Sequence, residues 1–150
     1  MSPGGSTVEG SVESTVECTA TRAEVEAFYA DQFALLDGGH VDAWVATFAD
    51  GATFETPTLS ARGHAEIARL TRQGVEARAR AGVVHRHLFT ALTLQEGGDG
   101  VGTTARTYVL VVGSDGAATT IVVSSVCTDR MVRLDGRLLV AARVVQVDGR

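Results

Sequence analysis

Several residue types and features are rare or absent in this sequence. Its 150 residues include two cysteines, Cys18 and Cys127, two prolines and no lysine, so that all 13 basic residues are arginine. Two cysteines so far apart indicate neither a disulfide framework nor a thiolate metal site. No apolar run reaches the roughly 18 residues that a membrane helix needs, and no basic segment followed by an apolar core marks a secretory signal. The composition favours a soluble, cytoplasmic protein.

The chain also lacks an excess of positive charge. Its 18 acidic and 13 basic residues give a net charge of −5, whereas nucleic acids and anionic membranes attract basic surfaces. We therefore expect no nucleic acid and no membrane among its partners. The glycines cluster at predicted turns rather than in a phosphate-binding loop, and Ser124 and Ser125 lie within a predicted strand, without the sharp turn of a nucleophilic serine. No cofactor site is indicated, and a serine hydrolase is disfavoured.

The length and hydrophobicity of the chain suit one domain with a proper core. Of its 150 residues, 45% are hydrophobic. The first 20 residues are mostly serine, threonine, glycine and glutamate, with too little apolar surface to offset the entropy lost on ordering. We predict a disordered tail over residues 1–20 and a single folded domain over residues 21–150.

Helices are predicted in the first half of this domain. Thr21 and Glu24 have the spacing of a capping box, and apolar residues follow at helical spacing. A Gly-Gly break ends this helix, a second amphipathic stretch follows it, and Gly82 ends a third helix. The predicted helices cover residues 22–36, 41–48 and 64–81.

Strands are predicted from residue 52 onward. Pro57 ends a short strand at residues 52–56 because proline lacks the amide that a central strand needs. Short Gly-Asp connections between the later β-branched runs imply antiparallel neighbours. This order predicts an α+β fold in which three N-terminal helices pack on one face of a curved antiparallel sheet. The long strands are predicted at residues 83–95, 101–112, 117–131 and 138–147.

A histidine pair and a carboxylate are the candidates for chemistry. His85 and His87 share one face of the first long strand, and Asp37 ends the helical stripe that carries Tyr29 and Phe33. An imidazole titrates near neutral pH and suits a general acid or base, while a neighbouring carboxylate fixes its tautomer and raises its basicity. These residue types therefore indicate acid–base chemistry.

Simpler interpretations of the same residues stay open. The two histidines could ligate a metal, but no third or fourth ligand has supporting spacing, so we predict no metal site. A core histidine bound to a backbone or carboxylate partner is another possibility, and Asp37 could simply form the turn before Gly38. Four arginines of the third helix, Arg69, Arg72, Arg78 and Arg80, are expected on a solvated face.

The second long strand has two different faces. Val109 and Val111 lie on one face, and Arg106 and Tyr108 lie on the other, so that only one of these sets can face a pocket. The large aromatic residues are more often core than pocket residues. Those that could contribute both to the core and to a pocket are Trp44, Phe48, Phe54 and Phe89.

Several motifs in order resemble a known family. The segment from Tyr29 to Trp44 (YADQFALLDGGHVDAW), then Phe48-Ala-Asp50, then Arg86-His87 and finally residues 132–136 (VRLDG), resemble the SnoaL-like branch of the nuclear-transport-factor-2-like (NTF2-like) superfamily. The resemblance covers about residues 22–148 and implies a cone-shaped curved sheet wrapped around helices. Dehydratases and polyketide cyclases of this family imply catalytic roles for His87 and Asp37. Where those dehydratases carry further polar groups, this sequence has Thr56 and Val111, which implies a more apolar pocket.

We therefore predict a cofactor-independent acid–base enzyme of the dehydratase, cyclase or isomerase type. The substrate would be a hydrophobic aromatic or polycyclic polyketide-like intermediate, and the family resemblance also implies a homodimer. A non-catalytic protein that binds such an intermediate and a structural subunit of a larger enzyme are the alternatives. The predicted catalytic residues are His87 and Asp37. The predicted substrate-binding residues are Tyr29, Phe33, Trp44, Phe48, Phe54, Thr56, Phe89, Val109 and Val111.

Overall fold

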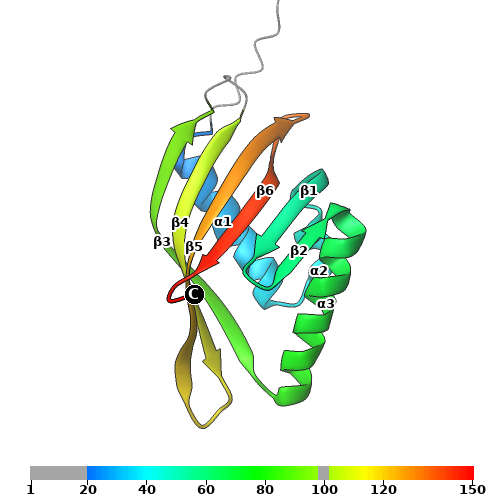
Figure 1. Ribbon diagram of the computed structural model, residues 1–150, viewed down its shortest axis with the longest axis vertical. Coiled ribbons are helices and arrows are strands. Elements are labelled where there is room, and N and C mark those ends of the chain that lie inside the picture. The colour runs from blue at the N-terminus through cyan, green and yellow to red at the C-terminus, as the bar shows by residue number, and fades with distance from the viewer. Residues whose placement is uncertain (1–19, 98–101) are drawn as a thin grey trace, which may run out of the picture.

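The computed structural model describes residues 20–97 and 102–150, and all but the last residue of the predicted tail, 1–20, lie outside these ranges. The described residues form three helices and six strands in the order α1-α2-β1-β2-α3-β3-β4-β5-β6, and the strands form one sheet in the order β2-β1-β6-β5-β4-β3 (Figure 1). The helices are α1 (Arg22–Asp37), α2 (Val41–Val45) and α3 (Gly63–Ala81). The strands are β1 (Phe48–Thr56), β2 (Leu59–Arg62), β3 (Val84–Glu96), β4 (Thr103–Ser114), β5 (Thr119–Leu134) and β6 (Arg137–Val147).

Local sequence signals set the ends of the long helices. Thr21 accepts a hydrogen bond from the Glu24 amide while the Glu24 carboxylate accepts one from the Thr21 amide, so the predicted capping box is confirmed. Gly82 ends α3 with a φ of 68°, in the left-handed region that glycine adopts without strain. Helix α2 ends at Val45, three residues earlier than predicted, because β1 begins at Phe48.

The predicted α+β class and the four-stranded antiparallel meander β3–β6 are confirmed, but the sheet is mixed rather than wholly antiparallel. Strand β1 pairs in parallel with β6, and β2, which the sequence did not indicate, pairs with β1 in antiparallel fashion. The parallel pair is possible because the chain between β1 and β6 passes through α3 and the other strands, a crossover long enough to reverse its direction.

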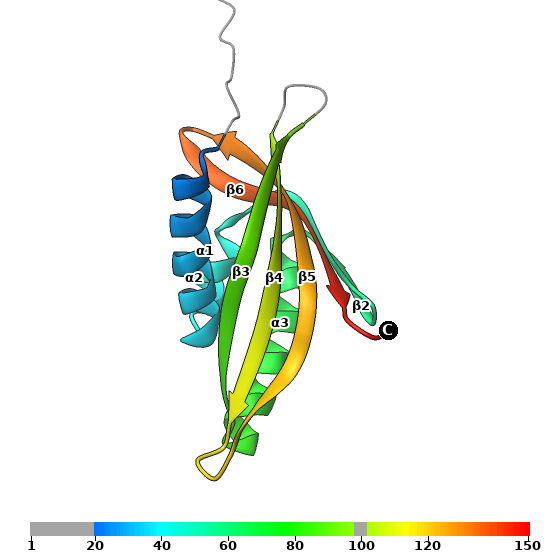
Figure 2. The same ribbon diagram turned by 90° about the vertical axis from the view of Figure 1, so that its left-hand side faces the viewer.

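The sheet curls around the helices on its concave side, as Figure 2 shows from the side of α1 and β3. Register shifts interrupt four of the five strand pairings, and such bulges bend and twist a strand. The buried core lies between α1 and the concave face and includes Tyr29, Phe33, Trp44 and Phe48. None of the helices in the described ranges is long and apolar enough to span a membrane.

Candidate active site

The C-terminal end of α1 brings Asp37 against β3. Oδ1 of Asp37 lies 2.6 Å from Nδ1 of His87, and Oδ2 accepts a hydrogen bond of 3.0 Å from the His87 backbone amide. A carboxylate only accepts hydrogen bonds, so the ring proton resides on Nδ1. Both side chains are mostly buried, at 15% exposure for His87 and 9% for Asp37. Asp37 therefore fixes the tautomer and the orientation of the imidazole.

The opposite ring nitrogen of His87 is free to meet a ligand. Nε2 has no hydrogen-bond partner among residues 20–97 and 102–150. Within these ranges, the only side-chain nitrogen or oxygen that is both fully buried and without a hydrogen bond is Nε1 of Trp44. The His87 ring stacks on Phe33, with centroids 5.5 Å apart and planes 6° apart. In a neutral ring protonated on Nδ1, Nε2 carries the lone pair and can accept a proton.

Two cavities meet at His87. The inner cavity, of about 160 Å³, lies between α1 and the concave sheet face, and the outer cavity, of about 370 Å³, lies toward α3 and β2. Both are lined mainly by apolar side chains, which suits a hydrophobic ligand. The residues that line both cavities are Leu36, Phe54, Thr56, His87, Val111 and Val123.

A buried polar network stands behind the inner cavity. Arg143 on β6 donates to Asp129 on β5 through Nε at 2.8 Å and Nη2 at 2.7 Å, and Nη2 also donates to Gln32 at 2.6 Å. The hydroxyl of Tyr29 donates to the same Asp129 carboxylate at 2.8 Å. Burial lowers the pKa of Arg143, but the charge and hydrogen bonds of Asp129, together with the nearby Cys127 and Tyr29, outweigh it and raise this pKa above its ordinary value. Arg143 is therefore a permanent buried cation.

Two hydrogen-bond donors beside the inner cavity have no partner in the described part of the chain. Arg143 lines this cavity and its Nη1 makes no hydrogen bond there, while Nε1 of Trp44 is buried without a partner. The Arg143 guanidinium lies 5.7 Å from the ring centroid of Phe33, the ring on which His87 stacks. A basic nitrogen and an arginine ion-paired with Asp129 therefore lie beside one apolar cavity, an arrangement that suits proton abstraction next to a carbonyl.

The thiol of Cys127, which also lines the inner cavity, is unreactive at neutral pH. Burial raises the pKa of the Cys127 thiol to about 12. The thiol is therefore protonated at neutral pH and is no nucleophile. No group of three or more histidine, cysteine, aspartate or glutamate side chains that could hold a metal occurs within residues 20–97 and 102–150.

The structure gathers most of the residues that the sequence singled out. Phe33, Trp44, Phe54, Thr56, Val109 and Val111 line the inner cavity with His87. The other three, Tyr29, Phe48 and Phe89, are absent from the lining of both cavities and pack in the core, Tyr29 because its hydroxyl is held by Asp129. Thr107, Val109 and Val111 form the buried face of β4, while Arg106 and Tyr108 are exposed on the other.

Asp129 and Arg143 were not predicted from the sequence. A signal was present, because Asp129 lies between Cys127 and Met131 on the buried face of β5, where a charged residue needs a partner. The partner follows only from the strand register, in which Asp129 lies directly opposite Arg143.

The sequence matches a family model over most of its length. The model describes a SnoaL-like domain and matches residues 17–144, so the chain belongs to the SnoaL-like family. Structures of about 21–22% identity described as cystatin-like or NTF2-like share the fold, which confirms the predicted NTF2-like architecture. No curated protein matches the chain.

Three solved structures are similar to most of this chain. ActVI-ORFA from Streptomyces coelicolor is 30% identical with a TM-score of 0.79, and the match covers 85% of this chain and 95% of that one. A protein from Catenulispora acidiphila in complex with S-DNPA is 35% identical with a TM-score of 0.75, covering 85% and 93% of the two chains. Aln2 from a Streptomyces species is 29% identical with a TM-score of 0.75, covering 84% and 89%.

Proposed function

We propose that the protein is a cofactor-independent acid–base enzyme that dehydrates, cyclises or isomerises an aromatic or polycyclic ketone of the polyketide type. The proposal rests on the His87–Asp37 pair. Asp37 holds the His87 ring, and Nε2 of His87, which has no hydrogen-bond partner in the described ranges, borders an apolar cavity. The ligand complex of the Catenulispora acidiphila relative supports small-molecule binding by this family.

In the proposed reaction, Nε2 of His87 takes a proton from the carbon next to the substrate carbonyl. Asp37 stabilises the imidazolium that forms, because both of its oxygens already accept hydrogen bonds from His87. The negative charge that develops on the carbonyl oxygen is stabilised by the free Nη1 of Arg143. The protonated His87 then returns the proton to another carbon or to a departing hydroxyl group. Such acid–base help is worth about 10²- to 10⁴-fold in rate.

Filling the cavity will remove ligand binding and turnover together. Val123 lines both cavities, so Val123→Trp occupies the volume that the substrate needs and lowers the affinity for a bicyclic ketone such as 1-tetralone at least about tenfold. Ile121→Trp is the matched control, because Ile121 is 64% exposed and belongs to neither cavity. The measurement is calorimetric titration, together with exchange of the α-protons of the ketone in D₂O by NMR. If Val123→Trp binds and exchanges like the unchanged protein, the ligand occupies another place.

A non-catalytic binding role is the second candidate. With Thr56 and Val111 in its wall, the cavity has few polar groups beyond His87 and Arg143. Such a cavity suits a protein that binds an intermediate and protects it without reacting with it. This role predicts that the protein binds the ketone but does not speed exchange of its protons. The acid–base proposal predicts both binding and exchange.

We also propose that the convex face of the sheet forms a homodimer. Leu88 and Tyr108 are 50% and 46% exposed there, and a symmetric pair of such faces buries apolar surface on both copies. Sedimentation velocity should give twice the chain mass of 15.6 kDa, and Leu88→Asp should shift the protein toward the monomer. A monomer of 15.6 kDa at micromolar concentration would contradict the dimer.

A further inference from the structure

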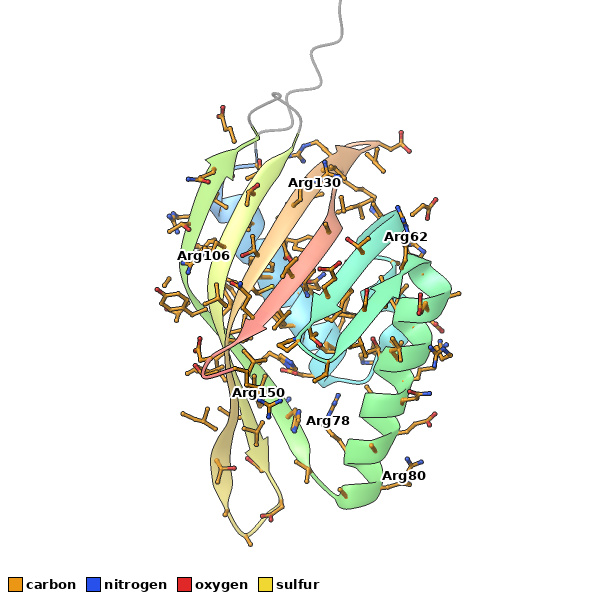
Figure 3. All side chains as sticks on the ribbon, viewed as in Figure 1. Arg62, Arg78, Arg80, Arg106, Arg130 and Arg150 are labelled. Atoms are coloured by element: carbon orange, nitrogen blue, oxygen red, sulfur yellow. The ribbon has the colours of Figure 1, made fainter. Side chains whose placement is uncertain are left out.

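The outer cavity combines an apolar wall with positive charge. Arg78 from α3 and both His85 and His87 from β3 line it, and none of the lining residues in the described ranges is aspartate or glutamate. Figure 3 shows the Arg78 side chain in the space between α3 and β3, whereas Arg80 points away from the strands. The expectation that Arg78 belongs to a solvated helix face is therefore wrong, although Arg69, Arg72 and Arg80 are exposed as predicted.

Arg78 has no hydrogen-bond or ion-pair partner within residues 20–97 and 102–150. Its Nη1 lies 3.2 Å from where a Cβ on Gly74 would stand, so the absence of a side chain at Gly74 makes room for the guanidinium. Burial lowers the pKa of Arg78 and the charge of Asp37 raises it, and an arginine remains protonated under either influence. The hydrogen bonds of the two Asp37 oxygens go to His87 and not to Arg78, so the donors of Arg78 stay available.

His85 adds a neutral donor beside this cation. Burial lowers the pKa of His85, and so do the charge of Arg78 and, whenever that ring is protonated, His87, while Asp37 on α1 opposes them. The ring is therefore neutral at pH 7 and can donate one hydrogen bond. Arg78 as a fixed cation and His85 as a neutral donor together match a planar group with a single negative charge. A carboxylate is such a group, and a guanidinium binds it through two parallel hydrogen bonds.

We propose that Arg78, assisted by His85, binds a carboxylate of the substrate at the outer cavity while the ring system of the substrate reaches His87. The substrate class is then a polycyclic ketone that carries a carboxylic acid side chain. This inference rests on the proposed function, because it places the acid relative to the same catalytic histidine. It assigns Arg78 to substrate orientation and specificity and gives it no part in proton transfer.

The test compares two ligands of nearly the same shape, one an anion at pH 7 and the other neutral. 2-Naphthaleneacetic acid and 2-naphthaleneacetamide share the ring system, and calorimetric titration at pH 7 measures both with the unchanged protein, Arg78→Gln and Arg80→Gln. We expect the unchanged protein and the exposed-site control Arg80→Gln to prefer the acid by about 10- to 100-fold, the range of a charge-assisted hydrogen-bond pair. Arg78→Gln should lose this preference while its affinity for the amide changes less than about threefold. Retention of the preference by Arg78→Gln would overturn the proposal.

A second readout follows the ring of His85. A carboxylate bound beside it offsets the charge of Arg78, so the acid should raise the pKa of His85 in an NMR titration and the amide should not. Equal affinity for acid and amide in the unchanged protein overturns the carboxylate site alone. Binding of neither compound overturns the apolar ligand cavity and, with it, the proposed function.

Discussion

His87→Asn will slow turnover of a competent polycyclic ketone by about 10²- to 10⁴-fold while the ligand still binds. Asparagine can replace the hydrogen bond from Nδ1 to Asp37, but it has no atom in place of the free Nε2 and does not titrate. The change therefore removes the proton carrier and keeps the polar contact that holds the end of α1 against β3. Turnover is measured under single-turnover conditions, and binding of the same compound by calorimetry.

Two further variants show whether the loss comes from His87 itself. His40→Asn is the control for a histidine that is exposed and belongs to neither cavity, and it should leave turnover unchanged. Asp37→Asn should also slow turnover. Asp37 accepts one hydrogen bond from His87 on each of its two oxygens, whereas an asparagine has one amide oxygen and places an NH₂ group, which only donates, at the second position. Turnover by His87→Asn at the rate of the unchanged protein would show that another group moves the proton.

Asp129→Asn will lower the free energy of unfolding by about 3–5 kcal/mol. Asp129 is fully buried and accepts hydrogen bonds from Tyr29 and from two nitrogens of Arg143, which is itself 2% exposed. Removing the carboxylate charge leaves the guanidinium buried without its counter-ion, and the desolvation of that cation is then uncompensated. Denaturant unfolding followed by circular dichroism measures the loss.

A surface pair supplies the matched control for this loss. Asp42 forms an ion pair with Arg72 in which the two side chains are 88% and 47% exposed, so Asp42→Asn should change the free energy of unfolding by less than about 1 kcal/mol. Combining Asp129→Asn with Arg143→Met removes the stranded cation and should recover part of the lost stability. If Asp129→Asn unfolds at the same denaturant concentration as Asp42→Asn, the buried network does not hold the two strands together.

The parts of the fold that depend on neighbours in sequence could be predicted, and those that depend on distant pairing could not. The capping box at Thr21, the turn at Gly82 and the β-branched runs of β3–β6 are local signals, and all three appear in the structure. The parallel pairing of β1 with β6 joins segments about 90 residues apart, which no local pattern specifies. Strand β2 escaped notice because its four residues, LSAR, contain no β-branched or aromatic side chain.

The same division applies to the site. Asp37 stood out as a carboxylate at the end of an apolar helical stripe, and His87 by strand alternation together with the family resemblance; their hydrogen bonds are present in the structure, while their catalytic roles stay predictions. Arg143 could not be assigned from sequence because its partner Asp129 is defined by the register of β5 and β6. Arg78 was assigned to solvent since helical periodicity does not show where β3 leaves a cavity open beside α3.

The most direct measurement is a crystal structure of the protein with a bound polycyclic ketone that it turns over, trapped in the His87→Asn variant. We expect the ketone to fill the cavities that meet at residue 87, with its reacting carbon about 3–3.5 Å from the place of the His87 Nε2 atom. We also expect the carbonyl oxygen to lie beside Nη1 of Arg143. A ketone bound on the convex face, or bound in the cavity with every exchangeable carbon far from residue 87, would contradict the assignment of His87 as the group that moves the proton.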